Sequence, residues 1–211
     1  MNNQESLAFF QQLAYNANDI QCVKLANKSD FTDIDADFIL NYADKNSEIL
    51  DLGSGTGLIV NKIYDKIKRI DCVDAYKEFT KFIIKSPNVN VYNVLLKDFK
   101  PDKKYDLISI FGTMHFFNER EAQELYKYYF KYLKHDGKII IKNQFGIEQD
   151  VTVEGYSQEQ KTEYYAQYRQ INKEVSILSN IGYKNIEVFD IYPPECNRWQ
   201  NTHFYAIVGG V

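Results

Sequence analysis

Residues 49–58 read ILDLGSGTGL, in which three glycines lie directly after one apolar run and directly before another. Glycine loses more conformational entropy on folding than any other residue, so a cluster of glycines indicates backbone that turns sharply or approaches another group closely. A glycine-rich turn from a strand into a helix is a common cofactor cradle, because free backbone N–H groups point outward there. A purely structural turn is the alternative. The stretch predicts a strand, a tight loop and a helix, with a cofactor beside the loop.

The chain up to about residue 142 alternates short apolar runs with amphipathic stretches. This alternation is typical of parallel strands joined by helices that cover both faces of the sheet. The pattern predicts strands at EILDL, RIDCVDA, VNVYNV, YDLISIFG and GKIIIKN. It predicts helices over 5–27, 32–43, 58–67, 77–86 and 118–133. Thr32 or Asp33 is expected to cap the second helix, and Asn118 with Glu121 resembles a capping box.

The last third of the chain follows a different pattern. A helix is expected over 158–181, followed by the strand NIEVFDIY, the loop PPECNRWQN and the strand THFYAIVGG. Two strands joined by so short a loop must be antiparallel. We therefore expect an α/β fold, a three-layer sandwich with a mostly parallel, seven-stranded, Rossmann-like sheet that ends in an antiparallel β-hairpin.

The 211 residues fall within the usual range for one domain, and no linker divides them. We expect the single domain 1–211 to have three parts. They are N-terminal helices that form a lid or substrate wall (1–45), a cofactor-binding half (46–142), and a substrate loop, helix and terminal hairpin (143–211).

The net charge and the cysteines argue against nucleic-acid binding and against a zinc site. A formal net charge of −4 argues against a large nucleic-acid footprint, which needs a basic face. Cys22, Cys72 and Cys196 are isolated, so no zinc motif is present and the thiols fit a reducing cytosol. The first residues do not resemble a signal peptide, and no apolar run is long enough to span a membrane. We expect a cytoplasmic protein without a bound metal.

The acid that follows the glycine loop indicates what the loop binds. An acid is expected about 20 residues after the first glycine, at the end of the next strand, where it accepts hydrogen bonds from ribose hydroxyls. Asp74 ends RIDCVDA, 21 residues after Gly53 (74 − 53), and Asp71 is a rival earlier in that strand. The third glycine is one place too early for a dinucleotide fingerprint, and Asp51 would repel a pyrophosphate but attract a cation. The loop therefore favours a ligand without phosphates and with some positive charge.

In these motifs and their order the chain resembles the class I S-adenosylmethionine-dependent methyltransferases. ILDLGSGTG resembles the first motif of that family, and the match continues in order through LLKDF, YDLISIFGTMHFF, LKHDGKIIIKN, LSNIGYKNIEVF and THFYAIVG, over about residues 35–211. One departure is HDG before the fifth strand, where the family often has Pro-Gly-Gly. The resemblance implies S-adenosyl-L-methionine as the cofactor. The residues that it places around the cofactor are Asp51, Gly53, Ser54, Gly55, Thr56, Gly57, Asp74 and Ala75, Asp98 at the adenine amino group with Phe99 beside the ring, and Phe111.

The acceptor of the methyl group must approach from the carboxyl ends of the strands. His115, directly after the fourth strand, is the candidate general base for removing a hydroxyl proton, or it only lines the pocket. Asn143, Arg198 and His203 are candidate substrate residues, with Arg198 suited to an acidic group. His135 precedes the fifth strand and is expected at the far edge of the sheet.

Motifs that are missing from the chain argue against macromolecular substrates. No Asn/Asp-Pro-Pro-Tyr motif and no cysteine nucleophile follows the fourth strand, so methylation of nucleic-acid bases is disfavoured. We expect O-methylation of a small metabolite or sugar derivative. The alternatives are N- or carboxyl-methylation of a small molecule, a nicotinamide-dependent oxidoreductase, and a catalytically silent subunit that binds the cofactor. The sequence leaves the acceptor and the oligomeric state open.

Overall fold

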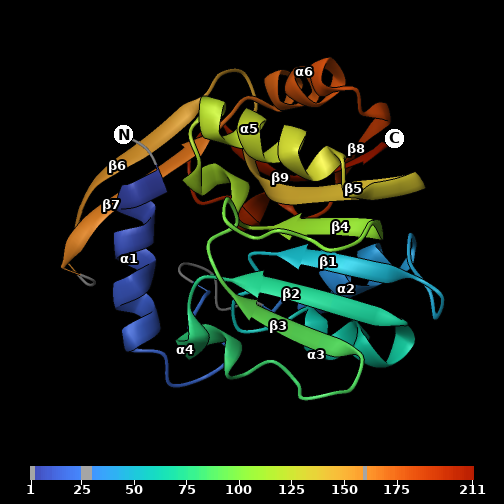
Figure 1. The fold of residues 1–211 in the computed structure, drawn as a ribbon. Coiled ribbons are helices and arrows are strands. Elements are labelled where there is room, and N and C mark those ends of the chain that lie inside the picture. The colour runs from blue at the N-terminus through green and yellow to red at the C-terminus, as the bar shows by residue number, and fades with distance from the viewer. Residues whose placement is uncertain (1–2, 25–29, 159–160) are drawn as a thin grey trace.

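The computed structural model describes residues 3–24, 30–158 and 161–211. Within these residues, seven strands form one sheet in the order β3-β2-β1-β4-β5-β9-β8, and two more form a separate hairpin, β6-β7 (Figure 1). The strands of the large sheet are β1 (Glu48–Leu52), β2 (Arg69–Asp74), β3 (Val89–Asn93), β4 (Tyr105–Phe111), β5 (Leu133–Gly146), β8 (Lys184–Asp190) and β9 (Thr202–Gly210). The hairpin consists of β6 (Val151–Ser157) and β7 (Thr162–Tyr168).

The pairing of the strands confirms the expected sheet. The pairs β1–β2, β2–β3, β1–β4 and β4–β5 are parallel, whereas β9 is antiparallel to both β5 and β8. Because β5 and β8 both run against β9, β8 has the same direction as the parallel strands. Its C-terminal end, and the loop that follows it, therefore lie at the same edge as the glycine-rich loop.

Helices cover both faces of the sheet, and each face has its own apolar core. On one face, α5 (Glu119–Phe130) and α6 (Ile171–Ile181) pack on the sheet through residues such as Tyr129 and Leu178. On the other face, α2 (Thr32–Leu40) and α3 (Val60–Ile63) pack through Ile39 and Ile63. The central parallel strands β1, β2 and β4 are almost fully buried, as parallel strands covered on two sides must be. No helix of the described residues is long and apolar enough to cross a membrane.

The region from residue 143 to residue 181 differs from the sequence-based prediction. The sequence pattern predicts a substrate loop from residue 143 and a helix over 158–181, but β5 continues to Gly146, β6 and β7 follow, and only α6 is helical. The stretch TEYYAQY carries Gln, Glu and Ala, which suit a helix, but its tyrosines suit a strand equally well. Pairing with β6 and contact with the N-terminal helix decide the outcome, and neither contact is visible in local sequence.

The helices of the first half are shorter than predicted. The first, α1 (Asn3–Tyr15), ends twelve residues before the predicted end at residue 27, and residues 25–27 lie outside the described part of the chain. α3 and α4 (Lys77–Thr80) are single turns, and a 3₁₀ turn, η1 (Tyr64–Lys66), follows α3. Neither Thr32 nor Asp33 caps α2, because Phe31 occupies the cap position and Asp30 Oδ1 accepts from the Thr32 backbone N–H at 3.0 Å.

The capping box at α5 is confirmed. Asn118 Oδ1 accepts from the Glu121 backbone N–H at 3.0 Å, and Glu121 Oε2 accepts from the Asn118 backbone N–H at 2.9 Å. Both contacts lie within four residues, so the local sequence contains everything needed to predict them.

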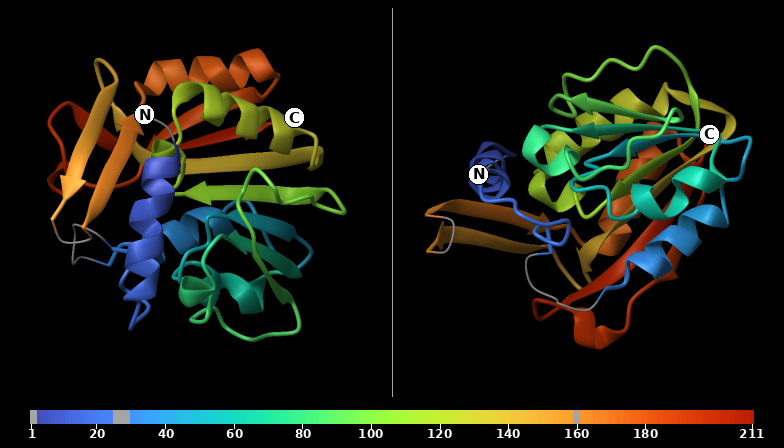
Figure 2. Two further views of the ribbon diagram at one scale, coloured as in Figure 1. Left: turned by 60° about the vertical axis from the view of Figure 1, so that its left-hand side comes forward. Right: turned by 90° about the horizontal axis from the view of Figure 1, so that it is seen from below.

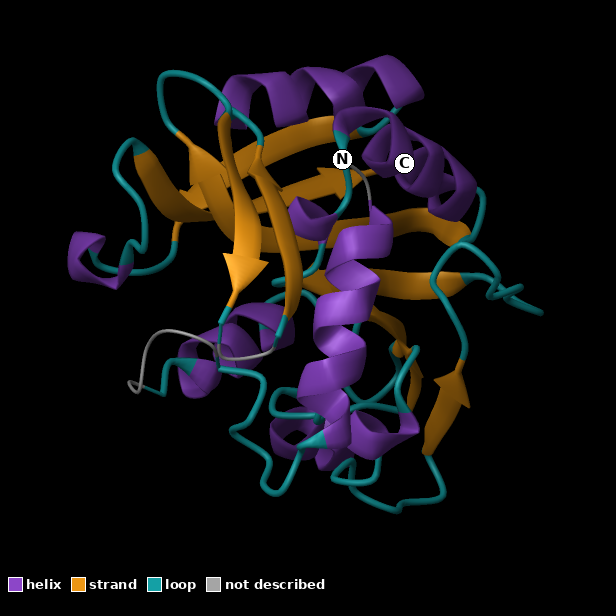
Figure 3. Ribbon diagram, turned by 90° about the vertical axis from the view of Figure 1, so that its left-hand side faces the viewer, coloured by secondary structure: helices purple, strands orange, loops and turns teal. Residues whose placement is uncertain are grey.

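The α1 helix and the β6-β7 hairpin lie side by side at the carboxyl ends of the parallel strands (Figures 2 and 3). Ser6 Oγ donates to the Tyr165 carbonyl at 2.8 Å, and the rings of Phe9 and Tyr164 meet edge to face at 5.0 Å. These two elements therefore form a wall over the edge of the sheet where the glycine-rich loop lies.

Candidate active site

A cavity of about 340 Å³ opens at the carboxyl ends of the strands. Its floor comes from the ends of β1, β2, β4 and β5, and its walls come from α1, the first turn of α2, β7 and the β8–β9 loop. The cavity has two halves, which we name the cofactor half and the acceptor half. The cofactor half contains the sequence-predicted residues Asp51, Gly53, Ser54, Gly55, Thr56, Asp74, Ala75 and Phe111. Of the predicted loop residues, only Gly57 does not line it.

The glycines of the loop differ in what lies beside their backbone. All three have positive φ, with Gly53 at +78° and Gly55 at +52°. A Cβ on Gly53 would overlap the Thr113 side chain after β4, whereas a Cβ on Gly55 would meet only Val23, at 3.7 Å. The backbone at Gly53 is therefore crowded by the protein itself, and the backbone at Gly55 faces the open cavity. Only the second fits the expectation that the glycines make room for a ligand.

Asp74 is held in place by the loop that it faces. Its carboxylate accepts from the Gly55 backbone N–H at 2.9 Å and from the Tyr76 backbone N–H at 3.0 Å. Burial raises the pKa of Asp74 to about 6, against the two hydrogen bonds and with a smaller contribution from the nearby Asp51 charge. The rival, Asp71, pairs instead with Arg69 and accepts from the Tyr105 hydroxyl, outside the cavity. Of the two acids, Asp74 is thus the one that lines the cavity.

Asp51 lies at the end of β1 under the loop. Its Oδ1 accepts from Ser109 Oγ on β4 at 2.7 Å, and burial raises the pKa of the carboxyl. A buried carboxylate of this kind favours a cationic neighbour, because a cation would offset the cost of keeping the charge away from water.

The structure does not bring Asp98 and Phe99 to the main cavity. Asp98 is exposed and borders a separate, shallow depression against α1, and Phe99 is buried against Tyr92 with the ring centroids 4.9 Å apart. The chain turns tightly after β3, with the Asp98 backbone N–H donating to the Leu95 carbonyl at 2.9 Å. As a result Leu95, Leu96 and Lys97 line the cavity where the sequence placed the following two residues.

His115 lines the acceptor half from the 3₁₀ turn η2 (Met114–Phe116) after β4. Its Nδ1 lies 3.1 Å from Asn143 Oδ1 on β5, and its ring is stacked on Tyr168 of β7 at 5.2 Å and 14°. When Nδ1 donates to Asn143, Nε2 carries the lone pair of the neutral ring. Burial, with smaller contributions from the charges of Arg198, Arg169 and Lys142, lowers the pKa of His115 to about 3 against the Asn143 hydrogen bond. The imidazole is therefore neutral near pH 7, and its pKa lies far below the ordinary value of histidine.

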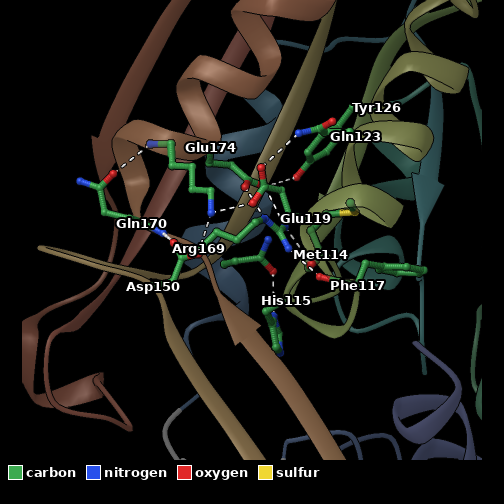
Figure 4. Close-up of polar contacts among 12 residues, drawn as sticks. Met114, His115, Phe117, Glu119, Gln123, Tyr126, Asp150, Arg169, Gln170 and Glu174 are labelled. Carbon is green, nitrogen blue, oxygen red and sulfur yellow. Dashed lines mark hydrogen bonds and ion pairs between the residues drawn. The ribbon is translucent and has the colours of Figure 1, made fainter. Parts of the chain in front are cut away.

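A buried ion pair that the sequence did not reveal holds the His115 turn (Figure 4). The Arg169 guanidinium donates to the carbonyls of Phe117, at 2.6 Å, and Met114, at 2.9 Å, on either side of the turn. It also pairs with Glu174 of α6 at 2.5 Å, and Glu174 accepts from the Tyr126 hydroxyl. Arg169 and Glu174 are 1% and 0% exposed, so this network is sealed from water. Consecutive residues of the chain thus support His115, since Tyr168 stacks on its ring and Arg169 fixes its backbone.

The acceptor half contains charged side chains that the sequence analysis missed. Lys142 of β5, four residues before that strand ends at Gly146, pairs with Asp35 of α2 at 2.9 Å and donates to the Tyr192 hydroxyl at 2.9 Å. Its ammonium group lies over the rings of Tyr192, at 4.5 Å, and Phe111, at 5.3 Å. The only signal in the sequence is a lysine that ends an apolar strand. Its partners are far away in the chain.

The remaining candidates take different positions. Arg198 lines the acceptor half, as expected for a substrate residue. Asn143 does not line the cavity but lies behind His115, and His203 is engaged by Asp190 at 2.7 Å and Asn197 at 3.1 Å. His135 is an exposed side chain at the opposite end of β5. Across residues 3–24, 30–158 and 161–211, no three His, Cys, Asp or Glu side chains group as metal ligands do.

Comparisons with known proteins agree with this geometry. Residues 49–137 match a family model described as a methyltransferase domain. No curated protein sequence matches the chain. Three similar solved structures share this fold over most of the length of both chains compared. A 1,6-didemethyltoxoflavin-N1-methyltransferase from Burkholderia thailandensis has a TM-score of 0.72 and 13% identity, covering 100% of this chain and 90% of the other. The N-methyltransferase NodS from Bradyrhizobium japonicum has a TM-score of 0.67 and 12% identity, covering 100% of this chain and 98% of the other. A SAM-dependent methyltransferase from Leishmania major has a TM-score of 0.73 and 15% identity, covering 98% of this chain and 82% of the other.

These likenesses show a shared fold, and the family model matches the strands and loops that build the cofactor half of the cavity. The chain therefore matches a methyltransferase family model over residues 49–137, and its fold is similar to that of S-adenosylmethionine-dependent methyltransferases.

Proposed function

We propose that the protein transfers a methyl group from S-adenosylmethionine to a small molecule. The observation that carries this proposal is one cavity in which the glycine loop, Asp51 and Asp74 face His115 across the ends of the parallel strands. The similar structures from Burkholderia thailandensis and Bradyrhizobium japonicum are complexes with S-adenosylhomocysteine, which supports S-adenosylmethionine as the cofactor here.

The cofactor half fits S-adenosylmethionine. Gly55 leaves the space beside the loop open, and the Asp74 carboxylate is already oriented to accept hydrogen bonds from ribose hydroxyls. Asp51 supplies a buried negative charge for the cationic amino acid part of the cofactor. When bound, S-adenosylmethionine supplies an electrophilic methyl group, so the protein has to align the acceptor, exclude water and accept a proton where one is released.

Within this activity we propose O-methylation, with His115 as the base. The neutral ring presents Nε2 as the proton acceptor, because Nδ1 is engaged by Asn143. In this role Nε2 would take up the proton that the acceptor hydroxyl loses when it is methylated. Tyr168 and Arg169 hold the ring in the orientation that this transfer needs.

N-methylation is the second candidate, and two observations favour it. The pKa of His115, about 3 before anything binds, makes it a weak base, whereas an amine with a free lone pair needs no base. Two of the similar structures are also named as N-methyltransferases.

Calorimetry with S-adenosylhomocysteine tests the cofactor assignment. We expect binding by the wild type and a strong loss in Asp74→Ala. The matched control is Asp98→Ala, which removes an exposed carboxylate outside the main cavity and is expected to bind normally. Absence of binding by the wild type would refute the proposal, and loss in Asp98→Ala alone would return the cofactor to the position implied by the sequence motif.

Transfer of a labelled methyl group to cell extract split by size tests the acceptor class. Label in the small-metabolite fraction is the expected result, and label confined to protein or nucleic acid would contradict it. With the product identified, His115→Ala separates the two candidates. O-methylation predicts a large fall in kcat with unchanged cofactor affinity, and N-methylation predicts little change in kcat.

A further inference from the structure

The acceptor half of the cavity carries more positive charge than its neighbours neutralise. Lys142 and Arg198 both line it, and Asp35 pairs with Lys142 at 2.9 Å. Arg198 has no ion pair with any residue that the structure describes, and its buried Nε lacks a hydrogen-bond partner. A guanidinium group partly withdrawn from water without a counter-ion is costly, so its position beside a cavity needs an explanation.

Arg198 is placed next to His115 by contacts of the β8–β9 loop. The adjacent Trp199 donates its indole N–H to the Tyr168 hydroxyl at 3.1 Å, and the Tyr168 ring is stacked on His115. On the other side, Lys142 directly precedes Asn143, the hydrogen-bond partner of His115. The charges of Arg198 and Lys142 both act on the imidazole. The candidate base therefore has a cation from the β8–β9 loop and a second from β5 close to it.

We infer that the methyl acceptor carries an oxyanion, a carboxylate or a phosphoryl group, that binds Arg198 beside His115. This inference rests on the proposed methyl transfer. The planar fork of a guanidinium matches two oxygens of a carboxylate or phosphoryl group, which a lone ammonium does not. The aromatic side chains Phe10, Phe116 and Phe204 also line the cavity and provide apolar surface for the rest of the acceptor.

An anionic acceptor also accounts for a base that is weak before the acceptor arrives. The charges that act on His115 are those of Arg198 in the β8–β9 loop, Arg169 directly after β7 and Lys142 of β5, and each disfavours a positive charge on the ring. An oxyanion bound between Arg198 and His115 offsets this field, which makes the ring a better proton acceptor only when the acceptor is present.

The test compares matched probes by calorimetry on protein saturated with S-adenosylhomocysteine. Benzoate and phenyl phosphate are the anionic probes, and benzamide is the neutral analogue of benzoate. We expect at least one anion to bind wild type at least about tenfold more tightly than benzamide, since charge-assisted bidentate hydrogen bonds are the strong ones. The better of the two anions identifies the acceptor as a carboxylate or a phosphoryl compound.

Variants locate the effect. Arg198→Gln should bring the anions to within about threefold of benzamide, and Arg198→Lys should recover only part of the preference because it lacks the fork. The control Arg120→Gln changes an exposed arginine on α5 and should keep the full preference. Equal binding of all three probes by wild type would overturn the inference, as would an unchanged preference in Arg198→Gln. Binding of S-adenosylhomocysteine, measured first, shows that each variant is folded and tests the proposed function separately.

Discussion

The two halves of the cavity are built in different ways. In the cofactor half, neighbouring strands and their loops meet through the backbone, as where the Gly53 N–H donates to the Val73 carbonyl at 2.8 Å. In the acceptor half, buried side chains from distant segments meet, and Lys142 and Asp35 are separated by 107 residues. The first half therefore depends on the space around the backbone, whereas the second depends on charge pairing. The two halves should respond to different mutations and to pH in different ways.

The largest effect is expected where the acceptor half is supported by buried charge. Arg169→Met leaves Glu174 buried without its partner, which typically costs about 3–5 kcal/mol in free energy of unfolding. The double variant Arg169→Met/Glu174→Gln should recover part of that loss, because no uncompensated charge remains. Urea unfolding measures both. A loss below about 1 kcal/mol in the single variant would show that the acceptor half does not depend on charge pairing.

In the cofactor half, the substitution to compare with Arg169→Met is Gly53→Ala, which adds one carbon beside the backbone. Gly53→Ala places a Cβ against Thr113 at φ +78°, and such backbone strain costs about 1–3 kcal/mol. We expect lower stability and weaker binding of S-adenosylhomocysteine. The control Gly210→Ala adds the same carbon where the nearest atoms are 3.8 Å away, and it should be nearly neutral. Equal effects of the two substitutions on stability would contradict a backbone-limited cofactor half.

A pH titration of stability should report on the acceptor half through His115. Its pKa is about 3 in the folded protein and near 6.5 when unfolded, so below pH 6.5 the unfolded state binds a proton that the folded state does not. Stability is then lost as the pH falls, by about 2 kcal/mol between pH 6.5 and 5. Asp74 contributes with the opposite sign, because its pKa is raised on folding. The difference between wild type and His115→Gln isolates the histidine, and a difference that does not change with pH would exclude a buried neutral imidazole.

In the cofactor half, pH should act on binding instead. The pKa of Asp74 is about 6, and only its carboxylate form accepts two ribose hydroxyls. Affinity for S-adenosylhomocysteine should be constant above pH 7 and fall by up to about tenfold per pH unit below 6. Asp74→Asn should bind weakly and without this step. Calorimetry at several pH values measures it, and the same step in Asp74→Asn would assign the titration to another group.

The same contrast explains how much the sequence could predict. The Asn118–Glu121 capping box is local and is confirmed, and strand register brings Asp51, Asp74 and most of the glycine loop to one cavity, where their role in cofactor binding stays a prediction. Asp98 and Phe99 do not line the main cavity, because a tight turn after β3 changes which side chains face it, and local sequence does not show this turn. The helix expected over 158–168 failed because pairing between β6 and β7 overrides local propensity. Lys142 with Asp35, and Arg169 with Glu174 and the His115 turn, are set by packing that no local pattern encodes.

Trp199 is the single tryptophan among 17 tyrosines, and it is hydrogen-bonded to Tyr168 at the rim of the acceptor half. Its indole is 41% exposed, so part of its surface already meets water. Light that excites indole selectively therefore reports on one place in this protein. A molecule that enters beside Arg198 and displaces the Tyr168 contact changes the emission of a single fluorophore, which gives the protein an optical signal for its own acceptor without any added label.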